Sequence, residues 1–353
     1  MEKKGKRFYY LEVLRAGSAL AVVMLHLASL NWFGYVGSFN WKVFTVVWGL
    51  MQFSVPVFFM MSGALFLQKE RENSISRIYT GYIPRMVVFL VFWAMIYQIY
   101  HLLGTDTEEN LFIRAAKNIM KGDTQVHLWF VYAIVGLYVL IPLLKAFTDQ
   151  ADPKLLWYAV ILAFIGTEVI PLLSRRSDIA SVIVVTNYTK LSVHGLGSYV
   201  GFFLLGHCLH SWEIPKKVRG IIYALGLLGV GTIIGRTLYL CLRDNTLNGD
   251  YFSFVMPMMP SVIFWSVGVF VFGKYTFVKE GRLAGAVRWV SQVSLGIYGI
   301  HMLPIFILQK LGLSTLSFNA LLSLPLLFLI VVGISVGVIS LMKKIPLLGR
   351  FIG

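Results

Sequence analysis

The chain has 353 residues, of which 58% are hydrophobic and only 13% are charged, and its formal net charge is +15. A soluble domain carries about 25% charged residues, so this composition excludes a water-soluble globular protein. Repeated apolar stretches of roughly 20 residues, each long enough to cross a hydrocarbon core of about 30 Å, predict an all-α integral membrane protein embedded in the lipid bilayer.

Hydropathy predicts ten transmembrane helices. They fall near residues 9–30, 43–67, 84–103, 127–147, 154–174, 195–212, 220–242, 253–273, 289–309 and 319–342. About 20 Lys and Arg residues lie in one set of alternating connections and about nine in the other. By the positive-inside rule, the N-terminus and the C-terminus are both predicted to be cytoplasmic. The positive charge is therefore a topology signal, and no nucleic-acid partner is expected.

The connections are short, so residues 1–353 are expected to form one membrane-embedded domain with no fused soluble domain. The two cysteines, Cys208 and Cys241, lie in apolar segments without metal-ligand spacing. No metal site is predicted from them, and we interpret both as small buried hydrophobic residues. Two histidines one turn apart, His207 and His210, lack a carboxylate or thiol partner in the sequence and are interpreted as structural.

The first predicted helix carries Arg15 and His26 on one face, because 11 residues correspond to three helical turns plus about 20°. Along the axis this spacing is roughly 16 Å, with Arg15 toward the cytoplasmic end and His26 in the outer half. Glu12 lies one turn before Arg15 and can pair with it. The alternative interpretation is structural: a snorkelling arginine and a hydrogen-bonded core histidine.

Arg77 and Arg85 follow the second predicted span on the cytoplasmic side, together with Lys69 and Arg71. One interpretation is a topology signal alone. The functional interpretation is a cradle for the phosphate groups of an anionic cosubstrate, which arginine binds with bidentate geometry.

Several polar side chains are predicted at the outer face. His127 and Trp129 open the fourth span, where Trp is also the usual residue of an interfacial aromatic belt. Arg236, late in the seventh span, can hold an anionic or polyhydroxyl acceptor, or can pair with Glu168. Buried charges within spans are expensive, so each is a functional candidate.

The ninth predicted span carries a polar stripe at spacings of three, four and three residues, formed by Ser291, Ser294, Tyr298 and His301. By the predicted topology, His301 lies in the outer half of the membrane, as does His26. The structural alternative is interhelical hydrogen bonding, which small polar side chains commonly provide in membrane bundles.

The segment RFYYLEVLRAGSALAVVMLH resembles the first-helix signature of the bacterial membrane acyltransferase family 3, whose members O-acetylate surface glycans. That signature is an acidic residue and Arg, ten residues, then His, and it is matched here by Glu12, Arg15 and His26. The segments SVPVFFMMSGALFL, HLWFVYAIVGLYVLIPLL and SLGIYGIH resemble further family segments. Their order and spacing are similar to the branch that contains the enterobacterial common antigen O-acetyltransferase.

The resemblance implies a multi-pass protein of the bacterial inner membrane with cytoplasmic acyl-CoA, most simply acetyl-CoA, as donor cosubstrate. No permanently bound cofactor is expected. The acceptor would be a glycan or a lipid-linked sugar reached from the outer side, and Arg15 and His26 would be the functional pair. The resemblance indicates neither the identity of the acceptor nor the oligomeric state.

Acyl transfer to an alcohol requires a base for the hydroxyl proton and a donor to the tetrahedral oxyanion. We expect His26 to be the base, with His301 and Tyr298 as orienting or oxyanion-donating neighbours. A covalent acyl-imidazole on His26 is the second mechanism considered. Arg15 would bind the phosphate or pantetheine groups of the donor. The competing functional class is a transporter or a flippase for a glycan, which also places Arg and His inside many spans.

Overall fold

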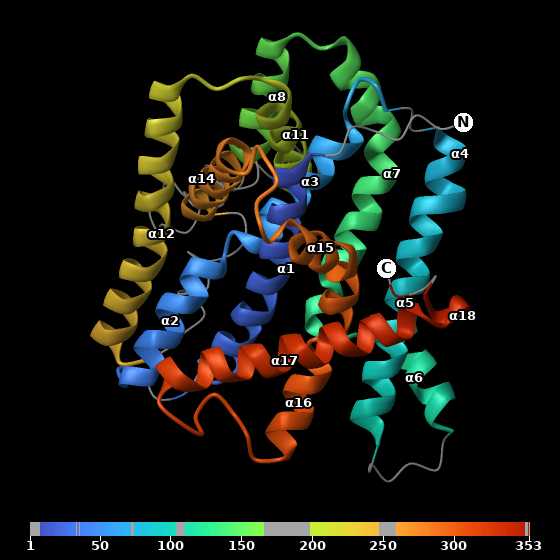
Figure 1. Cartoon of the computed structure of the whole chain (residues 1–353), viewed down its shortest axis with the longest axis vertical. Coiled ribbons are helices and arrows are strands. Elements are labelled where there is room, and N and C mark those ends of the chain that lie inside the picture. Colours follow the sequence, from blue (N-terminus) through green and yellow to red (C-terminus); the bar gives the residue numbers. More distant parts are fainter. Residues whose placement is uncertain are drawn as a thin grey trace, which may run out of the picture.

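The computed structural model describes residues 8–32, 34, 36–71, 74–103, 110–165, 198–246, 259–349 and 352. Every regular element in these ranges is a helix (Figure 1). The prediction of an all-helical fold is thereby confirmed for the described part of the chain. Glu168, a predicted partner of Arg236, lies outside it.

Six helical segments are long and apolar enough to cross a membrane. They are α1 (Tyr9–Ser29), α2 with α3 (Phe39–Met51 and Ser54–Phe66), α4 to α5 (Ile75–Arg77, a π-helical turn Ile78–Tyr82, and Ile83–Leu102), η2 with α7 (Val126–Leu128 and Trp129–Gln150), α12 (Lys216–Asp244) and α17 (Ala320–Lys343). A seventh is formed if α15 (Ala284–Ile300) and α16 (Met302–Lys310), bent by 51°, count as one span.

Ten spans are therefore not confirmed, because three predicted spans correspond to shorter described helices. These are α8 (Pro153–Phe164), α11 (Ser198–Ser211) and α14 (Pro260–Thr276). The predicted ranges 154–174, 195–212 and 253–273 each extend into residues outside the described part. The cytoplasmic placement of both termini stays a prediction.

Two predicted spans are interrupted rather than straight. The span at 43–67 is divided between α2 and α3 at Gln52 and Phe53. The span at 289–309 bends at His301, three residues before Pro304. Because proline lacks an N–H and its ring clashes with the carbonyl one turn earlier, Pro304 disrupts the helical ladder at Ile300. The bend places His301 at a helix break.

The helices surround α1, which packs against α2, α3, α14, α15 and α17 and lies near the centre of the molecule (Figure 1). Glycines allow some of these helices to approach very closely. A Cβ added at Gly63 of α3 would lie 1.7 Å from the Phe203 carbonyl oxygen of α11, and one at Gly206 would lie 1.9 Å from the Met60 carbonyl oxygen. Small residues at such crossings are typical of membrane bundles, where close packing replaces the hydrophobic effect.

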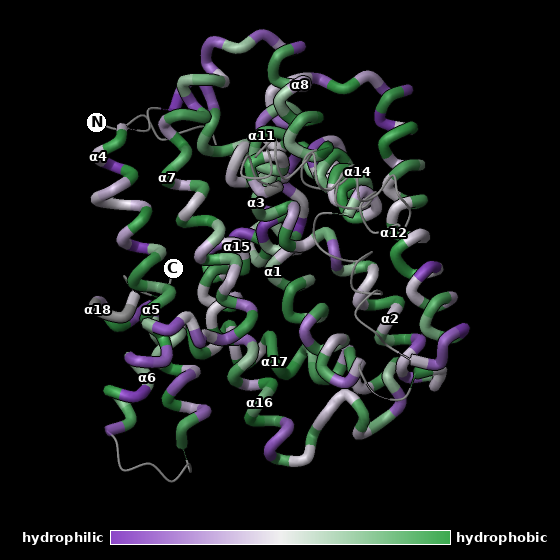
Figure 2. Tube along the Cα trace, turned by 180° about the vertical axis from the view of Figure 1, so that it is seen from behind, coloured by the Kyte–Doolittle hydropathy of each residue, from purple (hydrophilic) through white to green (hydrophobic). Residues whose placement is uncertain are grey.

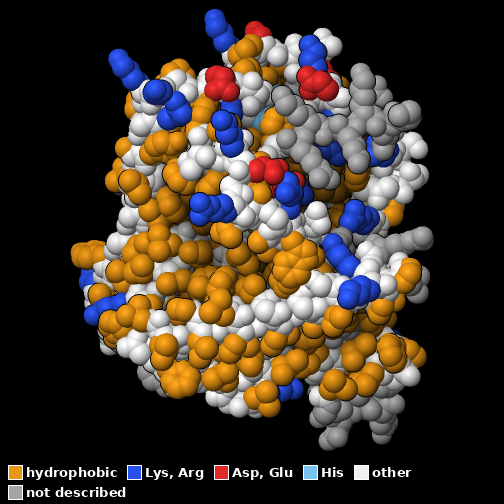
Figure 3. Space-filling model, viewed as in Figure 1, with side chains coloured by type: hydrophobic (Ala, Val, Ile, Leu, Met, Phe, Trp, Pro, Cys, Tyr) orange, Lys and Arg blue, Asp and Glu red, His pale blue; other side chains and the backbone are white. Residues whose placement is uncertain are grey.

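The surface is arranged as expected for a protein that crosses a bilayer. Figure 2 shows hydrophobic residues along much of the long helices and many hydrophilic residues near helix ends and connections. In Figure 3 the hydrophobic side chains cover the middle and lower part of the visible face, and charged side chains gather toward its upper end. The longest helix that was not predicted among those described is α6 (Leu111–Met120), ten residues long, which packs against α5.

Candidate active site

The functional face of α1 has a polar residue near each end, and both residues lie near the continuous segment formed by η2 and α7. His26 lies against His127, with ring centroids 6.1 Å apart, and Arg15 lies within electrostatic range of Tyr138 of α7. His26 and Arg15 are 11 residues apart, as are His127 and Tyr138. The two segments therefore run in opposite directions past each other, and the site has two separate ends.

At the first end, three histidines from three distant segments come together. His26 belongs to α1, His127 to the short η2 turn before α7, and His301 to the break between α15 and α16. The ring centroids of His26 and His301 are 4.9 Å apart, and those of His127 and His301 are 5.0 Å apart. His127 and His301 are buried, whereas His26 is half-buried. We call these residues the three-histidine cluster.

The hydrogen bonds of the cluster define the proton positions on two of its rings. His26 Nδ1 lies 2.9 Å from the Val22 carbonyl oxygen, and His301 Nδ1 lies 2.8 Å from the Tyr298 carbonyl oxygen. A carbonyl oxygen can only accept, so in each neutral ring Nδ1 carries the hydrogen. His301 Nε2, 3.2 Å from His26 Nδ1, then accepts from it. His26 Nε2 is left with its lone pair, as a general base requires.

Two tyrosines hold the backbone around the cluster. The Tyr298 hydroxyl donates to the carbonyl oxygen of His127, and the Tyr97 hydroxyl donates to the carbonyl oxygen of Gly299 at 2.8 Å. Trp93 packs on Gly299, where an added Cβ would lie 2.3 Å from the indole nitrogen. Both hydroxyl protons are thus used to fix main-chain segments that carry histidines.

At the second end, arginines gather around two tyrosines. Arg71 donates to the Tyr82 hydroxyl at 3.0 Å and stacks over Phe66 at 4.1 Å from the ring centroid. The guanidinium of Arg77 lies 5.6 Å from the Tyr82 ring centroid. Four arginines lie in contact with or in electrostatic range of Tyr82 or Tyr138: Arg15, Arg71, Arg77 and Arg85. We call these four residues the arginine cluster.

Other predicted residues lie at the margins of these clusters. Glu12 is half-buried and within electrostatic range of Arg15, but in the described part of the chain no ion pair joins them. Arg236 is exposed on α12, which packs mainly against α14 and α2 rather than against the helices that carry the histidines. The predicted alternative pairing of Arg236 with Glu168 lies outside the described residues.

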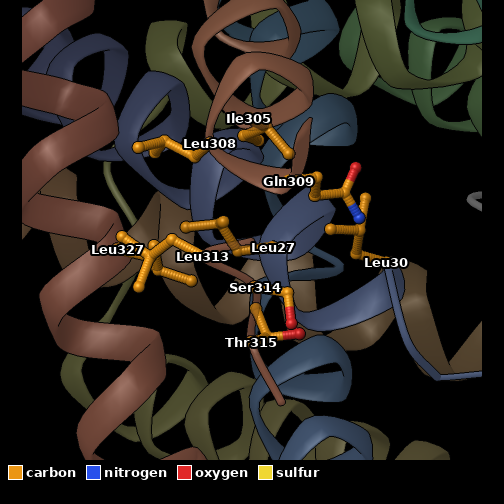
Figure 4. Close-up of a pocket in the computed structure, with 9 residues that line it drawn as sticks. All are labelled: Leu27, Leu30, Ile305, Leu308, Gln309, Leu313, Ser314, Thr315 and Leu327. Carbon is orange, nitrogen blue, oxygen red and sulfur yellow. The ribbon is translucent and has the colours of Figure 1, made fainter. Parts of the chain in front are cut away.

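Trp129 lies beside an open groove at the same end of α7 as the three-histidine cluster. The groove has a volume of about 380 Å³ and is lined by Gly122, Thr124, Gln125, Val126, Trp129 and Tyr132. A second cavity lies at the C-terminal end of α1, between α16 and α17 (Figure 4). Its volume of about 10 Å³ is close to the minimum for a single water molecule, so of these two cavities the groove is the one with room for a sugar.

Another histidine, His210, lies at the arginine end of α1, where its ring has side-chain partners. The Tyr10 hydroxyl lies 2.5 Å from His210 Nδ1, and the Gln68 side chain lies 3.4 Å from His210 Nε2. Among the described residues, no group of three or more His, Cys, Asp or Glu side chains is arranged to hold a metal ion. The three-histidine cluster is therefore considered for proton chemistry.

Sequence reasoning named every residue of the two clusters but missed two tyrosines that contact them. Tyr97 and Tyr82 lie in apolar helices, where a tyrosine has the same pattern as any packed aromatic residue. The sequence pattern is the same for a tyrosine that only packs and for one whose hydroxyl donates to a distant carbonyl oxygen. The spacing of Trp93 and Tyr97, one helical turn apart, was the only available signal.

The fold and the two clusters define a polytopic helical protein of membrane type with a histidine site between its helices. The sequence model of an acyltransferase domain, that of acyltransferase family 3, matches residues 8–342. The chain therefore belongs to acyltransferase family 3, as its first helix led us to expect, and acyl transfer in general is supported. Among curated proteins and among solved structures, none is significantly similar to the chain.

Proposed function

We propose that the protein is an acyl-CoA-dependent O-acyltransferase that moves an acetyl group to a hydroxyl of a cell-surface glycan or its lipid-linked precursor. The observation that carries the proposal is the His26–His301 pair, in which the Nε2 lone pair of a half-buried histidine is left to accept a proton. The family match favours an acyltransferase over the transporter or flippase alternative.

In the proposed reaction, His26 Nε2 removes the proton from the acceptor hydroxyl while that oxygen attacks the thioester carbonyl carbon. The tetrahedral intermediate collapses, the C–S bond breaks, and the CoA thiolate leaves and takes up the proton from His26. His301 accepts from His26 Nδ1–H throughout. This hydrogen bond orients the His26 ring and stabilises the imidazolium that forms, as the aspartate carboxylate does in a Ser-His-Asp triad. The second mechanism would place the acyl group covalently on His26 before transfer.

The arginine cluster is the proposed donor site. Its guanidinium groups can hold the phosphates of CoA, and Arg15 lies 11 residues before His26 on the same helix. This spacing corresponds to roughly 16 Å along the axis, a distance that a pantetheine arm can span. The proposed acceptor site is the groove that contains Trp129 and Tyr132, because aromatic side chains next to a few polar groups, here Thr124 and Gln125, are typical of small-molecule sites.

The proposal is tested with purified protein in proteoliposomes, radiolabelled acetyl-CoA and a cell-surface glycan fraction as acceptor. We expect label in the glycan with the wild type and none above background with His26→Ala, although this variant inserts and folds normally. Label transfer by His26→Ala at near the wild-type rate would remove His26 from the chemistry. A wild type that moves a glycan across the bilayer and leaves acetyl-CoA intact would support the transporter class instead.

A further inference from the structure

His127 is a buried histidine whose ring nitrogens make no hydrogen bond of normal geometry within the described part of the chain. Its side chain is 3% exposed, and among the described residues neither Nδ1 nor Nε2 has a partner at hydrogen-bonding geometry. The Gly299 backbone lies within electrostatic range of the ring, but its carbonyl oxygen already accepts from the Tyr97 hydroxyl. A neutral imidazole always presents one N–H and one lone pair. Burying both without a partner is unfavourable, so such a group in a folded protein calls for an explanation. A group that reaches the ring from outside the chain provides one.

The unpartnered ring lies inside the proposed active site rather than elsewhere in the core. Its centroid is 5.0 Å from that of His301, 5.2 Å from that of Tyr97 and 5.5 Å from that of Tyr298. The ring of the proposed base, His26, is 6.1 Å away. A reacting group held at His26 is therefore also close to His127.

The proposed reaction still lacks a donor to the oxyanion, and the two tyrosine hydroxyls whose rings contact the three-histidine cluster are already engaged. Tyr298, which the sequence suggested for this role, donates to the carbonyl oxygen of His127. Tyr97 donates to Gly299, and Ser294 donates to the carbonyl oxygen of Ser291. Among the described residues, His127 is the remaining donor whose ring contacts that of His26.

Trp93, which packs beside the cluster, is another buried donor to consider. The indole nitrogen of Trp93 is also buried without a partner in the described structure. It faces the backbone of α15, however, because a Cβ on Gly299 would lie only 2.3 Å from it. Trp93 therefore packs behind the helix that carries His301, whereas His127 lies among the rings of the cluster.

We propose that His127 is a catalytic residue that donates a ring N–H to the thioester carbonyl oxygen. This inference rests on the proposed acyltransferase function. When the acceptor oxygen attacks the carbonyl carbon, the C=O electron pair moves onto that oxygen, and His127 stabilises the resulting negative charge. When the C–S bond breaks, the carbonyl re-forms and His127 retains its proton. Tyr298 is a positioning residue in this arrangement, since its hydroxyl holds the main chain of His127.

The test compares two replacements of His127 in the wild-type background. His127→Phe keeps a ring for packing but removes both nitrogens, so we expect kcat to fall about 100-fold or more, the usual effect of losing one oxyanion donor. The KM for acetyl-CoA should change less than about threefold, and the melting temperature should stay equal or rise, because no hydrogen bond is lost. His127→Gln restores an N–H and should recover at least about tenfold of the lost kcat.

The matched control is His210→Phe, which removes a histidine that does have partners, Tyr10 and Gln68. We expect it to lower the melting temperature while the kcat of the folded protein is unchanged. The inference is overturned if His127→Phe keeps kcat within about threefold of wild type. It is also overturned if the lower activity of His127→Phe is accounted for by a smaller amount of folded protein, or if the kcat of His127→Gln is no higher than that of His127→Phe.

The same experiment separates this inference from the function on which it rests. A wild type that does not transfer the acetyl group overturns both. Transfer that is abolished by His26→Ala but retained by His127→Phe overturns only the role of His127.

Discussion

The pairing of His301 with His26 predicts a partial rather than complete loss of activity when His301 is replaced. In His301→Leu the imidazolium of His26 loses the acceptor 3.2 Å from Nδ1 but keeps the Val22 carbonyl oxygen at 2.9 Å. One hydrogen bond to a charged group contributes about 1.5–3 kcal/mol. Since about 1.4 kcal/mol corresponds to tenfold in rate, kcat should fall about 10- to 150-fold.

The measurement is initial-rate transfer from radiolabelled acetyl-CoA in proteoliposomes, with the folded fraction determined by size-exclusion chromatography. His301→Gln is the control, because its amide oxygen can accept from His26 Nδ1–H and should keep kcat within about tenfold of wild type. A loss as large as that of His26→Ala would mean that His301 itself handles the substrate proton. A rate within about twofold of wild type would refute the proposed hydrogen-bonded pair.

Further variants test the donor site, the acceptor site and the packing. Arg71→Ala should raise the KM for acetyl-CoA about tenfold, from the loss of one charged hydrogen bond, and leave the KM for the acceptor unchanged; an equal rise in both would contradict a donor site. Trp129→Ala should raise the KM for the glycan while the KM for acetyl-CoA stays constant, as measured in the same assay. Gly63→Ala places a Cβ 1.7 Å from the Phe203 carbonyl oxygen, so the free energy of unfolding should fall by about 3 kcal/mol. This loss is measured as a lower melting temperature in detergent. An unchanged melting temperature would show that α3 and α11 are not in this close contact.

The part of the site that lies on one helix could be predicted from the sequence. Arg15 and His26 are related by a fixed helical repeat, and basic residues in the connections gave them a predicted direction. The meeting of His26, His127 and His301 could not be derived in this way. It depends on how three segments pack, and no local pattern encodes contacts between residues 100 or more apart in the chain.

Helix breaks explain where the fold departed from expectation. Hydropathy averages over a window and therefore treated 289–309 as one straight span. Pro304 disrupts the ladder within it, and the resulting bend gives His301 its place beside His26. The same averaging joined α2 and α3 across Gln52 and Phe53. The prediction for Tyr298 shows a different limit: the stripe indicated a polar side chain facing other helices, but only the packed structure pairs its hydroxyl with a carbonyl.

The parts of α1 and α7 that lie between the two clusters are apolar, and we call them the apolar interval. On α1, the positions between Arg15 and His26 on the same face are Ala19 and Val22, and both are buried. On α7, residues 131 and 134 have the corresponding spacing between His127 and Tyr138, and they are a buried valine and isoleucine. Phosphate groups entering this apolar interval would lose their hydration without compensation. In the proposed reaction, therefore, the phosphates stay at the arginine cluster, and only the uncharged pantetheine arm extends toward His26 and delivers the acetyl group there.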